Sequence, residues 1–189
     1  MKRIGIFGGS FDPPHRAHLE IATRATEQIP LDTLYFVPSY RSPLKGQPAV
    51  ASAHHRMAMI QLLAGLRTEW QVLSYEIDQR RAVATIETTE DLKQHHPQAS
   101  CYLIMGGDQA AQFTIWRDWQ RLAGLVHIVC FTRAGAPPVE PFTADLTIIP
   151  YYAQLASTMV RDRIRKGEST DDSLTPVVQA YIKKHKLYQ

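Results

Sequence analysis

The chain has 189 residues, 44% of them apolar and 21% charged, which is typical of a single globular domain, here 1–189. Lys and Arg number 21 against 18 for Asp and Glu, an excess too small to predict nucleic acid or an anionic membrane as the main partner. The longest apolar runs have strand length and a signal-peptide pattern is lacking, so we expect a cytoplasmic protein. Cys101 and Cys130 lie in apolar runs, which predicts buried reduced thiols rather than a zinc site.

The first part of the chain predicts two strand–helix units. An apolar run over 3–7 ends at Gly8-Gly9, and an amphipathic helix follows from about His15 to Pro30. A second strand over 34–37 stops at Pro38. Ser52 is then typical of the N-cap of a second helix, whose apolar positions are Met57, Ile60, Leu62 and Leu63.

The same alternation continues to the end of the chain. The predicted elements are a strand at 70–73, a helix at 85–95, a strand at 101–105 that breaks at Gly106-Gly107, a helical stretch through Phe113 and Trp116, strands at 126–131 and 147–149, and helices from Ser157 and Ser173. The Pro- and Gly-containing segments 38–48 and 134–141 are short enough to be surface loops rather than linkers. Alternating strands and helices predict an α/β protein with a doubly wound parallel sheet.

The loop after the first strand favours a phosphate ligand. In such a sheet, ligands lie beyond the carboxyl ends of the strands, where the strand order reverses. Gly8 and Gly9 let a ligand approach the main chain, and His15 and His18 lie on one face at a helix N-terminus, which attracts anions. The alternative is a plain turn with histidines that cap the helix or face solvent, but the combination with Asp12-Pro13 favours a site. A G-x-G-x-x-G dinucleotide motif is lacking, which argues against a nicotinamide-dependent oxidoreductase.

Two segments resemble the signatures of the nucleotidyltransferases that carry an H-x-G-H motif. Residues 9–18 match G-x-F-D-P-x-H-x-G-H at Gly9, Phe11, Asp12, Pro13, His15 and His18, with Ala17 in place of the usual glycine. Residues 155–161 resemble I-S-S-T-x-I-R through Ser157, Thr158 and Arg161, with Ala156 in place of the first serine. Ser157 and Thr158 can cap a helix from whose first turn Arg161 projects, so that hydroxyls, backbone donors and a guanidinium converge on one anion.

The similarity extends over essentially the whole chain, which resembles the bacterial-type nicotinate-nucleotide adenylyltransferases. Further matching segments occur in family order: 36–38, 42–45, the helix with Arg56, 104–108, Phe113 with Trp116, 133–135 and 186–188. The resemblance implies a Rossmann-like nucleotidyltransferase fold. It also implies that the chain is an enzyme of NAD biosynthesis, which transfers the adenylyl group of ATP to nicotinate mononucleotide and gives deamido-NAD and pyrophosphate.

The resemblance also implies roles for individual residues. His15 and His18 would stabilise the α-phosphate during direct in-line attack, without a covalent enzyme intermediate. The other implied ATP and phosphate contacts are Gly8, Gly9, Ser10, Phe11, Lys45, Gly106, Asp108, Ser157, Thr158 and Arg161. Mg²⁺ would sit on the ATP phosphates, where Asp108 would contact either the nucleotide sugar or this ion, and we assign no protein side chain as its ligand.

The nicotinate nucleotide would be bound by Thr85, Trp116 and Arg133. The family commonly has S-Y-T where this chain has Val83-Ala84-Thr85, so only the threonine is kept. The alternatives to these binding roles are that Trp116 is a core residue and that Arg133 is an ordinary surface residue. Both substrates are small molecules, and the sequence leaves a homo-oligomer open.

Other functions remain alternatives. Another transferase of this kind could use nicotinamide mononucleotide or phosphopantetheine as acceptor, or could transfer a cytidylyl group. A non-catalytic nucleotide sensor on the same fold is a further alternative, which we expect to have lost a phosphate ligand. His15, His18 and Arg161 are all present, which favours the enzyme.

Overall fold

The computed structural model describes residues 1–41, 48–133, 145–151 and 155–189. The described residues form one sheet of six strands, all paired in parallel, in the order β3-β2-β1-β4-β5-β6. The strands are β1 (Arg3–Gly9), β2 (Thr33–Pro38), β3 (Trp70–Val72), β4 (Ser100–Gly106), β5 (Val126–Arg133) and β6 (Leu146–Tyr151). The predicted doubly wound parallel sheet is confirmed, and its order reverses between β1 and β4.

The helices follow the predicted alternation with three differences. Their bounds are α1 (Arg16–Gln28), α2 (Ala53–Ala64), α3 (Tyr75–Asp78), α4 (Thr85–His95), α5 (Gly107–Ala110), α6 (Trp119–Ala123), α7 (Ser157–Arg165) and α8 (Pro176–Lys184). The short helices α3 and α6 were not predicted. The stretch around Phe113 is a single 3₁₀ turn (Phe113–Ile115), and α8 begins at Pro176 rather than Ser173, because proline suits the first helical position.

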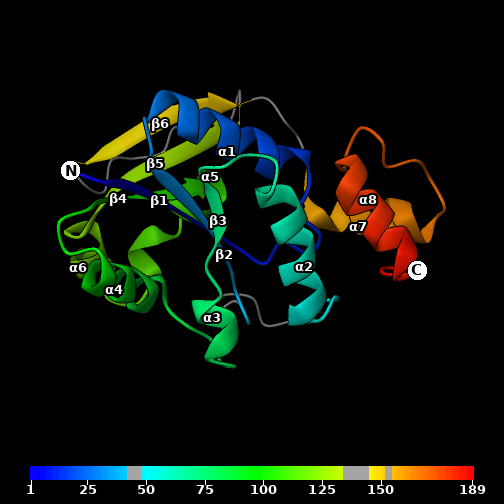
Figure 1. Cartoon of the computed structure of the whole chain (residues 1–189), viewed down its shortest axis with the longest axis horizontal. Helices are drawn as coiled ribbons and strands as arrows, with labels where there is room; N and C mark the ends of the chain where they lie inside the picture. Colours follow the sequence, from blue (N-terminus) through cyan, green and yellow to red (C-terminus); the bar gives the residue numbers. More distant parts are fainter. Residues whose placement is uncertain (42–47, 134–144, 152–154) are drawn as a thin grey trace.

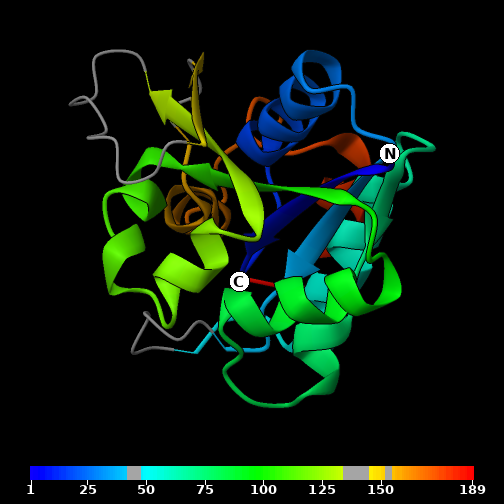
Figure 2. The ribbon, with the colours of Figure 1, turned by 90° about the vertical axis from the view of Figure 1, so that its left-hand side faces the viewer.

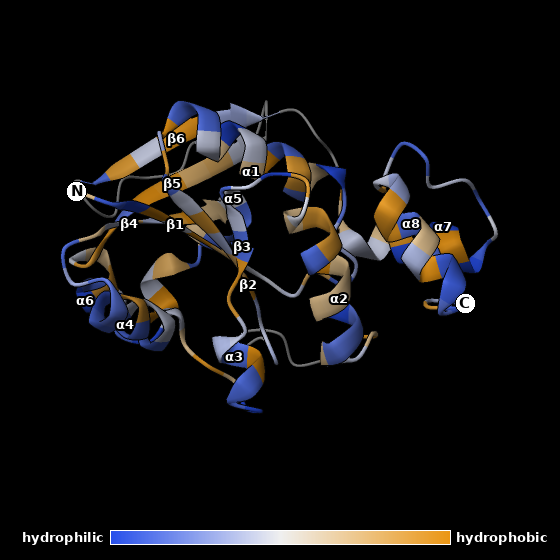
Figure 3. Ribbon diagram, in the orientation of Figure 1, coloured by the Kyte–Doolittle hydropathy of each residue, from blue (hydrophilic) through white to orange (hydrophobic). Residues whose placement is uncertain are grey.

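Helices cover both faces of the sheet. Side chains alternate along β1, so that Ile6 packs with α4 and α6 while Phe7 packs with α1 and α2. Figures 1 and 2 show α1 and α4 on opposite sides of the sheet. The strands between them are largely apolar (Figure 3), as expected when a parallel sheet is buried on both faces. Cys101 and Cys130 are buried in this core as free thiols, as predicted.

Helix α2 starts as predicted and buries two of the predicted apolar positions, Ile60 and Leu63. The Ser52 side chain accepts a hydrogen bond from the backbone N–H of His55 at 3.3 Å, which confirms the N-cap. The buried face contains Arg56, Met59, Ile60 and Leu63, whereas the predicted apolar position Leu62 is 38% exposed. The structure therefore places an arginine in the apolar stripe of this helix.

Helices α7 and α8 pack on α2 in a third apolar cluster, which includes Met59, Val160, Val178, Ile182 and Tyr188. In Figure 1 these two helices lie beyond α2, away from β6. The backbone N–H of Arg16, at the start of α1, donates to the carbonyl of Ser173 at 2.9 Å. The segment that follows the sheet is thereby held against the loop that follows β1. Within the described ranges, none of the helices has the length and apolar character needed to cross a membrane.

Candidate active site

The loop after β1 lies at the carboxyl edge of the sheet. Beyond the last β1–β4 pair, Phe7 with Ile104, the two strands end at Gly9 and Gly106, where the sheet order reverses. A Cβ atom at Gly8 would have no neighbour within 4 Å, so the main chain there is open to a ligand. A Cβ at Gly9 would lie 3.1 Å from the Phe11 ring, which shows why the second position is glycine.

The ring of Phe11 belongs to the apolar core that supports the loop after β1. Its ring is 1% exposed and packs edge-on against Phe7 and Phe36, with centroids 5.7 and 5.9 Å apart. The ring also packs against His18 at 5.0 Å. Phe11 was predicted among the phosphate contacts, but its side chain belongs to the core and orients the histidine instead. Ala17, the departure from the family pattern, is buried in the same core.

The two histidines of the signature stack on each other. The ring centroids of His15 and His18 are 3.8 Å apart with 26° between the planes, so the predicted shared face is confirmed. The backbone N–H of His15 donates to Nδ1 of His18 at 3.1 Å. An acceptor role for Nδ1 puts the proton of the neutral ring on Nε2. His18 can therefore donate one hydrogen bond from Nε2, which is the geometry that a phosphate oxygen requires.

Asp12 orders the loop after β1. It is 4% exposed, and its carboxylate accepts hydrogen bonds from the backbone N–H groups of Val50 at 2.7 Å and Ala51 at 3.0 Å. The hydroxyl of Tyr188 donates to the same carboxylate at 2.7 Å. Burial, together with this carboxylate, raises the pKa of the Tyr188 phenol, so the hydroxyl keeps its proton and remains a donor.

Helix α7 reaches the loop in a way that corrects the prediction. Ala156 is the N-cap, and neither Ser157 nor Thr158 makes a capping hydrogen bond. The Ser157 hydroxyl instead donates to the carbonyl of Pro13 at 3.0 Å, while Thr158 is exposed. The predicted caps are wrong because Ala156 occupies the N-cap position, while Ser157 is the first helical residue and its hydroxyl donates to the loop after β1.

Arg161 is the fifth residue of α7, one position beyond the predicted first turn. Its Nη1 donates to the carbonyl of Asp12 at 2.6 Å and lies 3.8 Å from the Asp12 carboxylate. Its Nε is buried and has no hydrogen-bond partner among the described residues. The two signature segments therefore meet in the structure, and one guanidinium N–H is left without a protein partner among the described residues.

The end of β4 supplies two more predicted residues. Gly106 is the N-cap of the short helix α5, and its N–H donates to the Gln109 side chain at 3.2 Å. Asp108 lies in the first turn of that helix and is exposed. Both residues lie at the same edge of the sheet as the loop after β1.

The predicted nicotinate pocket lies at the start of α4. Thr85 is the first residue of α4, and Ala84 and Trp116 both pack against the apolar cluster on this face of the sheet. Trp116 is half-buried against Phe113, with centroids 5.3 Å apart, and its buried indole N–H has no partner in the part of the chain that the structure describes. Trp116 is therefore partly core and partly available to a ligand.

A charge cluster holds the first turn of α4 in place. The Glu87 carboxylate accepts from the backbone N–H of Ala84 at 3.0 Å and from the guanidinium groups of Arg81 at 2.6 Å and Arg117 at 2.7 Å. The hydrogen bonds from Arg81 are the largest of the effects that lower the pKa of Glu87 to about 2. The carboxylate therefore stays ionised and fixes the backbone around Thr85. Lys45 and the side chain of Arg133 lie outside the described residues.

Sequence reasoning missed two residues of the site, Arg56 and Tyr188. Arg56 is 1% exposed, and its guanidinium donates to the carbonyls of Ser10 at 2.7 Å, Tyr40 at 3.2 Å and Ala51 at 3.3 Å. Burial lowers its pKa, and the nearby Asp12 opposes that effect. The signal in the sequence was its place in the stripe formed with Met59, Ile60 and Leu63. For Tyr188, nothing local in the sequence points to the loop.

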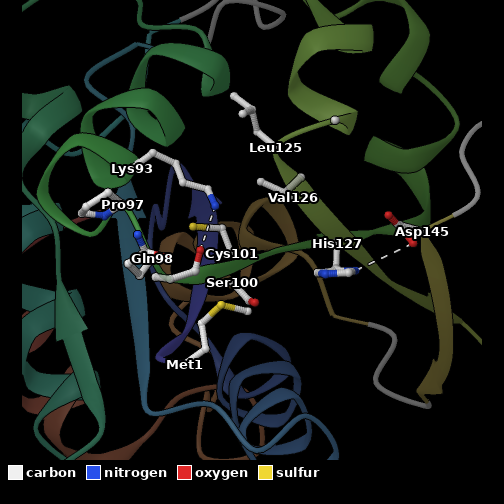
Figure 4. Close-up of a pocket in the computed structure, with 12 residues that line it drawn as sticks. Met1, Lys93, Pro97, Gln98, Ser100, Cys101, Leu125, Val126, His127 and Asp145 are labelled. Atoms are coloured by element: carbon white, nitrogen blue, oxygen red, sulfur yellow. Dashed lines mark hydrogen bonds and ion pairs between the residues drawn. The ribbon is translucent and has the colours of Figure 1, made fainter.

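A cavity of about 290 Å³ opens at the opposite, amino edge of the sheet (Figure 4). It is lined by the first residues of β4 and β5, among them Cys101 and His127. Figure 4 shows His127 paired with Asp145, whose atoms are 3.9 Å apart. Because ligands of such sheets bind at the carboxyl edge, this cavity is separate from the candidate site. In the described ranges, no group of three or more His, Cys, Asp or Glu side chains could hold a metal ion.

Comparisons with known proteins show the family and the fold of the chain. The profile of the family described as "Cytidylyltransferase-like" matches residues 6–163. The chain is 33% identical to a "Probable nicotinate-nucleotide adenylyltransferase" of Shouchella clausii, covering 100% of this chain and 97% of that protein. It is 29% identical over full length to the nicotinate-nucleotide adenylyltransferase of Bacillus subtilis. A solved Plasmodium falciparum nicotinic acid mononucleotide adenylyltransferase complexed with NaAD shares the fold, with a TM-score of 0.82 at 19% identity, covering 100% and 98% of the two chains.

Proposed function

Because the chain belongs to the nicotinate-nucleotide adenylyltransferases within the cytidylyltransferase-like family, we propose that it transfers the adenylyl group of ATP to nicotinate mononucleotide. The products are deamido-NAD and pyrophosphate. The observation that carries the proposal is the contact of Arg161 with Asp12 in the loop whose end carries the stacked His15–His18 pair, at the edge where β1 and β4 diverge. That arrangement offers several donors to one polyphosphate.

The reaction is a direct displacement at phosphorus. An oxygen of the mononucleotide's 5′-phosphate attacks the α-phosphorus of ATP, and the bond from that phosphorus to the β-phosphate bridging oxygen breaks as the new bond forms. The attacking oxygen is already an anion at neutral pH, so the protein needs neither a nucleophile nor a general base. Catalysis consists of alignment and stabilisation of charge.

His15 and His18 stabilise the α-phosphate. His18 donates from Nε2, since its Nδ1 already accepts from the backbone of His15. Because the two rings are stacked, both imidazoles can face one phosphate group, and in this proposal the added charge of the transition state strengthens their hydrogen bonds. The glycines Gly8 and Gly9, with Ser10, present the main chain to the same phosphates.

Arg161 holds the leaving pyrophosphate. Its Nη1 is fixed by the Asp12 carbonyl, which leaves Nε for a phosphate oxygen. Thr158 is exposed beside it and can add a hydroxyl donor, whereas Ser157 contributes by fixing the loop. Lys45 reaches over the β- and γ-phosphates in this proposal, and Gly106 and Asp108 contact the nucleotide from the end of β4.

Magnesium enters the reaction as part of the ATP substrate. The carboxylate in the loop, that of Asp12, already accepts two backbone N–H groups and the Tyr188 hydroxyl. The donors around the loop are imidazole and guanidinium groups, which suit phosphate rather than a cation. The ion therefore neutralises phosphate charge without a dedicated carboxylate cage.

The acceptor's pyridine ring lies against Trp116, with its carboxylate at the first turn of α4. Thr85 and the backbone N–H groups there are donors, and a carboxylate accepts from them where a carboxamide would direct its NH₂ group at them. Because main-chain donors do not depend on side chains, Val83 and Ala84 are compatible with a preference for the acid. Arg133 contributes from the end of β5.

The test is acceptor choice by the purified protein. Pyrophosphate release is followed with ATP and magnesium and, separately, nicotinate mononucleotide, nicotinamide mononucleotide or phosphopantetheine, with CTP replacing ATP in a parallel set. We expect nicotinate mononucleotide to exceed its amide by about tenfold to a thousandfold in kcat/KM. Equal efficiencies would reject the nicotinate pocket, and nucleotide binding without turnover on any acceptor would favour the sensor.

A further inference from the structure

Tyr188 is anchored in the loop by a hydrogen bond that the reaction described above does not use. The residue follows α8 and is 6% exposed, with its ring in the cluster formed by α2, α7 and α8. Its hydroxyl lies 2.7 Å from Oδ1 of Asp12, 176 residues earlier in the chain. This hydrogen bond therefore joins the segment after α8 to the loop after β1, which carries the candidate phosphate-binding residues.

The backbone around Tyr188 is held in an unfavourable conformation. Lys186 and Tyr188 have φ angles of +49° and +65°, in the left-handed region that residues with a side chain avoid. Such a conformation persists where the surrounding structure enforces it, and it is common at functional sites. Here it turns the chain back so that the tyrosine ring enters the cluster and its hydroxyl reaches the loop.

Asp12 and Arg161 form a long ion pair of 3.8 Å rather than a close, hydrogen-bonded one. Nη1 of Arg161 donates to the main-chain carbonyl of Asp12 at 2.6 Å, while the nearest carboxylate oxygen, Oδ2, is 3.8 Å away. Oδ2 accepts from Val50 N, and Oδ1 accepts from Ala51 N and the Tyr188 hydroxyl. These donors turn the carboxylate away from a two-oxygen contact with the guanidinium, which is the stronger form of this pair.

We propose that Tyr188 is a positioning residue for adenylyl transfer, whose hydroxyl holds the Asp12 carboxylate so that Arg161 stays directed at the phosphates of ATP. The inference rests on the proposed function for the identity of that ligand. Without the hydroxyl, Asp12 loses a donor and turns toward Arg161. When the guanidinium of Arg161 forms a close ion pair with this carboxylate, it no longer binds the pyrophosphate group.

The decisive variant is Tyr188→Phe, which keeps the buried ring and removes the hydroxyl. We expect the KM for ATP, and the Kd of magnesium–ATP measured by calorimetry without acceptor, to rise at least about fivefold. The KM for nicotinate mononucleotide should stay within about twofold, because its pocket lies at α4. A general loosening of the fold would instead raise both.

Tyr181→Phe is the matched control. Its hydroxyl lies 3.0 Å from Nδ1 of His55 and joins α8 to α2, in the same helical layer but without contact with Asp12. Removing it disturbs the packing of α8 to a similar degree, so we expect both KM values to stay within about twofold of wild type. Thermal unfolding of both variants should be cooperative and similar.

A second test places Tyr188→Phe in an Arg161→Ala background. If the hydroxyl acts through Arg161, the effect on ATP binding disappears there, because the guanidinium to be positioned is gone. The inference is overturned if the two effects add, if Tyr181→Phe behaves as Tyr188→Phe does, if both substrates weaken alike, or if Tyr188→Phe fails to fold. Failure of the wild type to form deamido-NAD would reject the proposed function instead. Calorimetry would still measure the Kd of magnesium–ATP and so test the role of Tyr188.

Discussion

Replacing Arg56 with lysine tests whether a buried arginine holds the loop after β1. The guanidinium donates to three carbonyls, those of Ser10, Tyr40 and Ala51, from three different nitrogens. A lysine keeps the charge but has one nitrogen, which cannot reach three acceptors arranged around a planar fork. Two carbonyls therefore lose their donor.

Each unsatisfied buried acceptor costs about 1–3 kcal/mol, so the loss of two donors in Arg56→Lys should lower the free energy of unfolding by about 2–6 kcal/mol. That is a large share of the total for a domain of this kind, about 5–15 kcal/mol. In urea, with an m-value of about 2 kcal/mol/M, the midpoint should fall by about 1–3 M with an unchanged m-value, measured by circular dichroism or tryptophan fluorescence.

Arg67→Lys is the matched control for this measurement. Arg67 pairs with Glu27 at 2.9 Å and Glu69 at 3.5 Å, but its side chain is 34% exposed. An exposed ion pair of this kind contributes at most about 1 kcal/mol, so the midpoint should move little. If the two substitutions shift the midpoint equally, the three carbonyl contacts do not hold the loop in the way described.

Three further predictions concern single side chains. His18→Ala should lower kcat about a hundredfold or more in a variant that still folds, because it removes one donor to the transition state; near-normal turnover of the folded variant would exclude that role. Arg161→Lys should raise the KM for ATP more than the KM for the mononucleotide, since a point charge does not replace a planar fork; the reverse order would move Arg161 to the acceptor. Glu76 hydrogen-bonds to Thr88, and burial raises its pKa from 4.5 to about 7, so ionisation destabilises the fold as pH rises from about 5 to 8. Glu76→Gln should therefore gain stability relative to wild type at pH 8 but not at pH 5, in urea unfolding at both values; a pH-independent difference would contradict the shift.

Local sequence patterns predicted the parts of this fold that depend on neighbouring residues. The strand before Gly8 and the helix after His15 follow from periodicity and glycine placement, and α4 has the predicted bounds, Thr85–His95. Parallel strands then bring their carboxyl ends to one edge, which is why the two signatures could be expected to meet there.

Long-range contacts account for the errors. Ser157 has the residue type of a helix cap, but its hydroxyl bonds to Pro13, an acceptor 144 residues away that no local pattern reveals. Phe11 matches a phosphate-loop motif, yet its ring belongs to the core. Arg56 has the charge of a surface residue and the helical spacing of a buried one, and the spacing was the more informative of the two.

The distance along the chain between the parts of the phosphate site has a consequence for protein synthesis. The contacts of the loop with Ser157, Arg161 and Tyr188 span 144, 149 and 176 residues, so the loop leaves the ribosome long before its partners. A nascent chain that ends after β4 can pair β1 with β2 and β4, but Asp12 and Pro13 still lack these contacts. Contacts of such long range form late and slow the search for the native state. The contacts that complete the site therefore become available only when almost the whole chain has been synthesised.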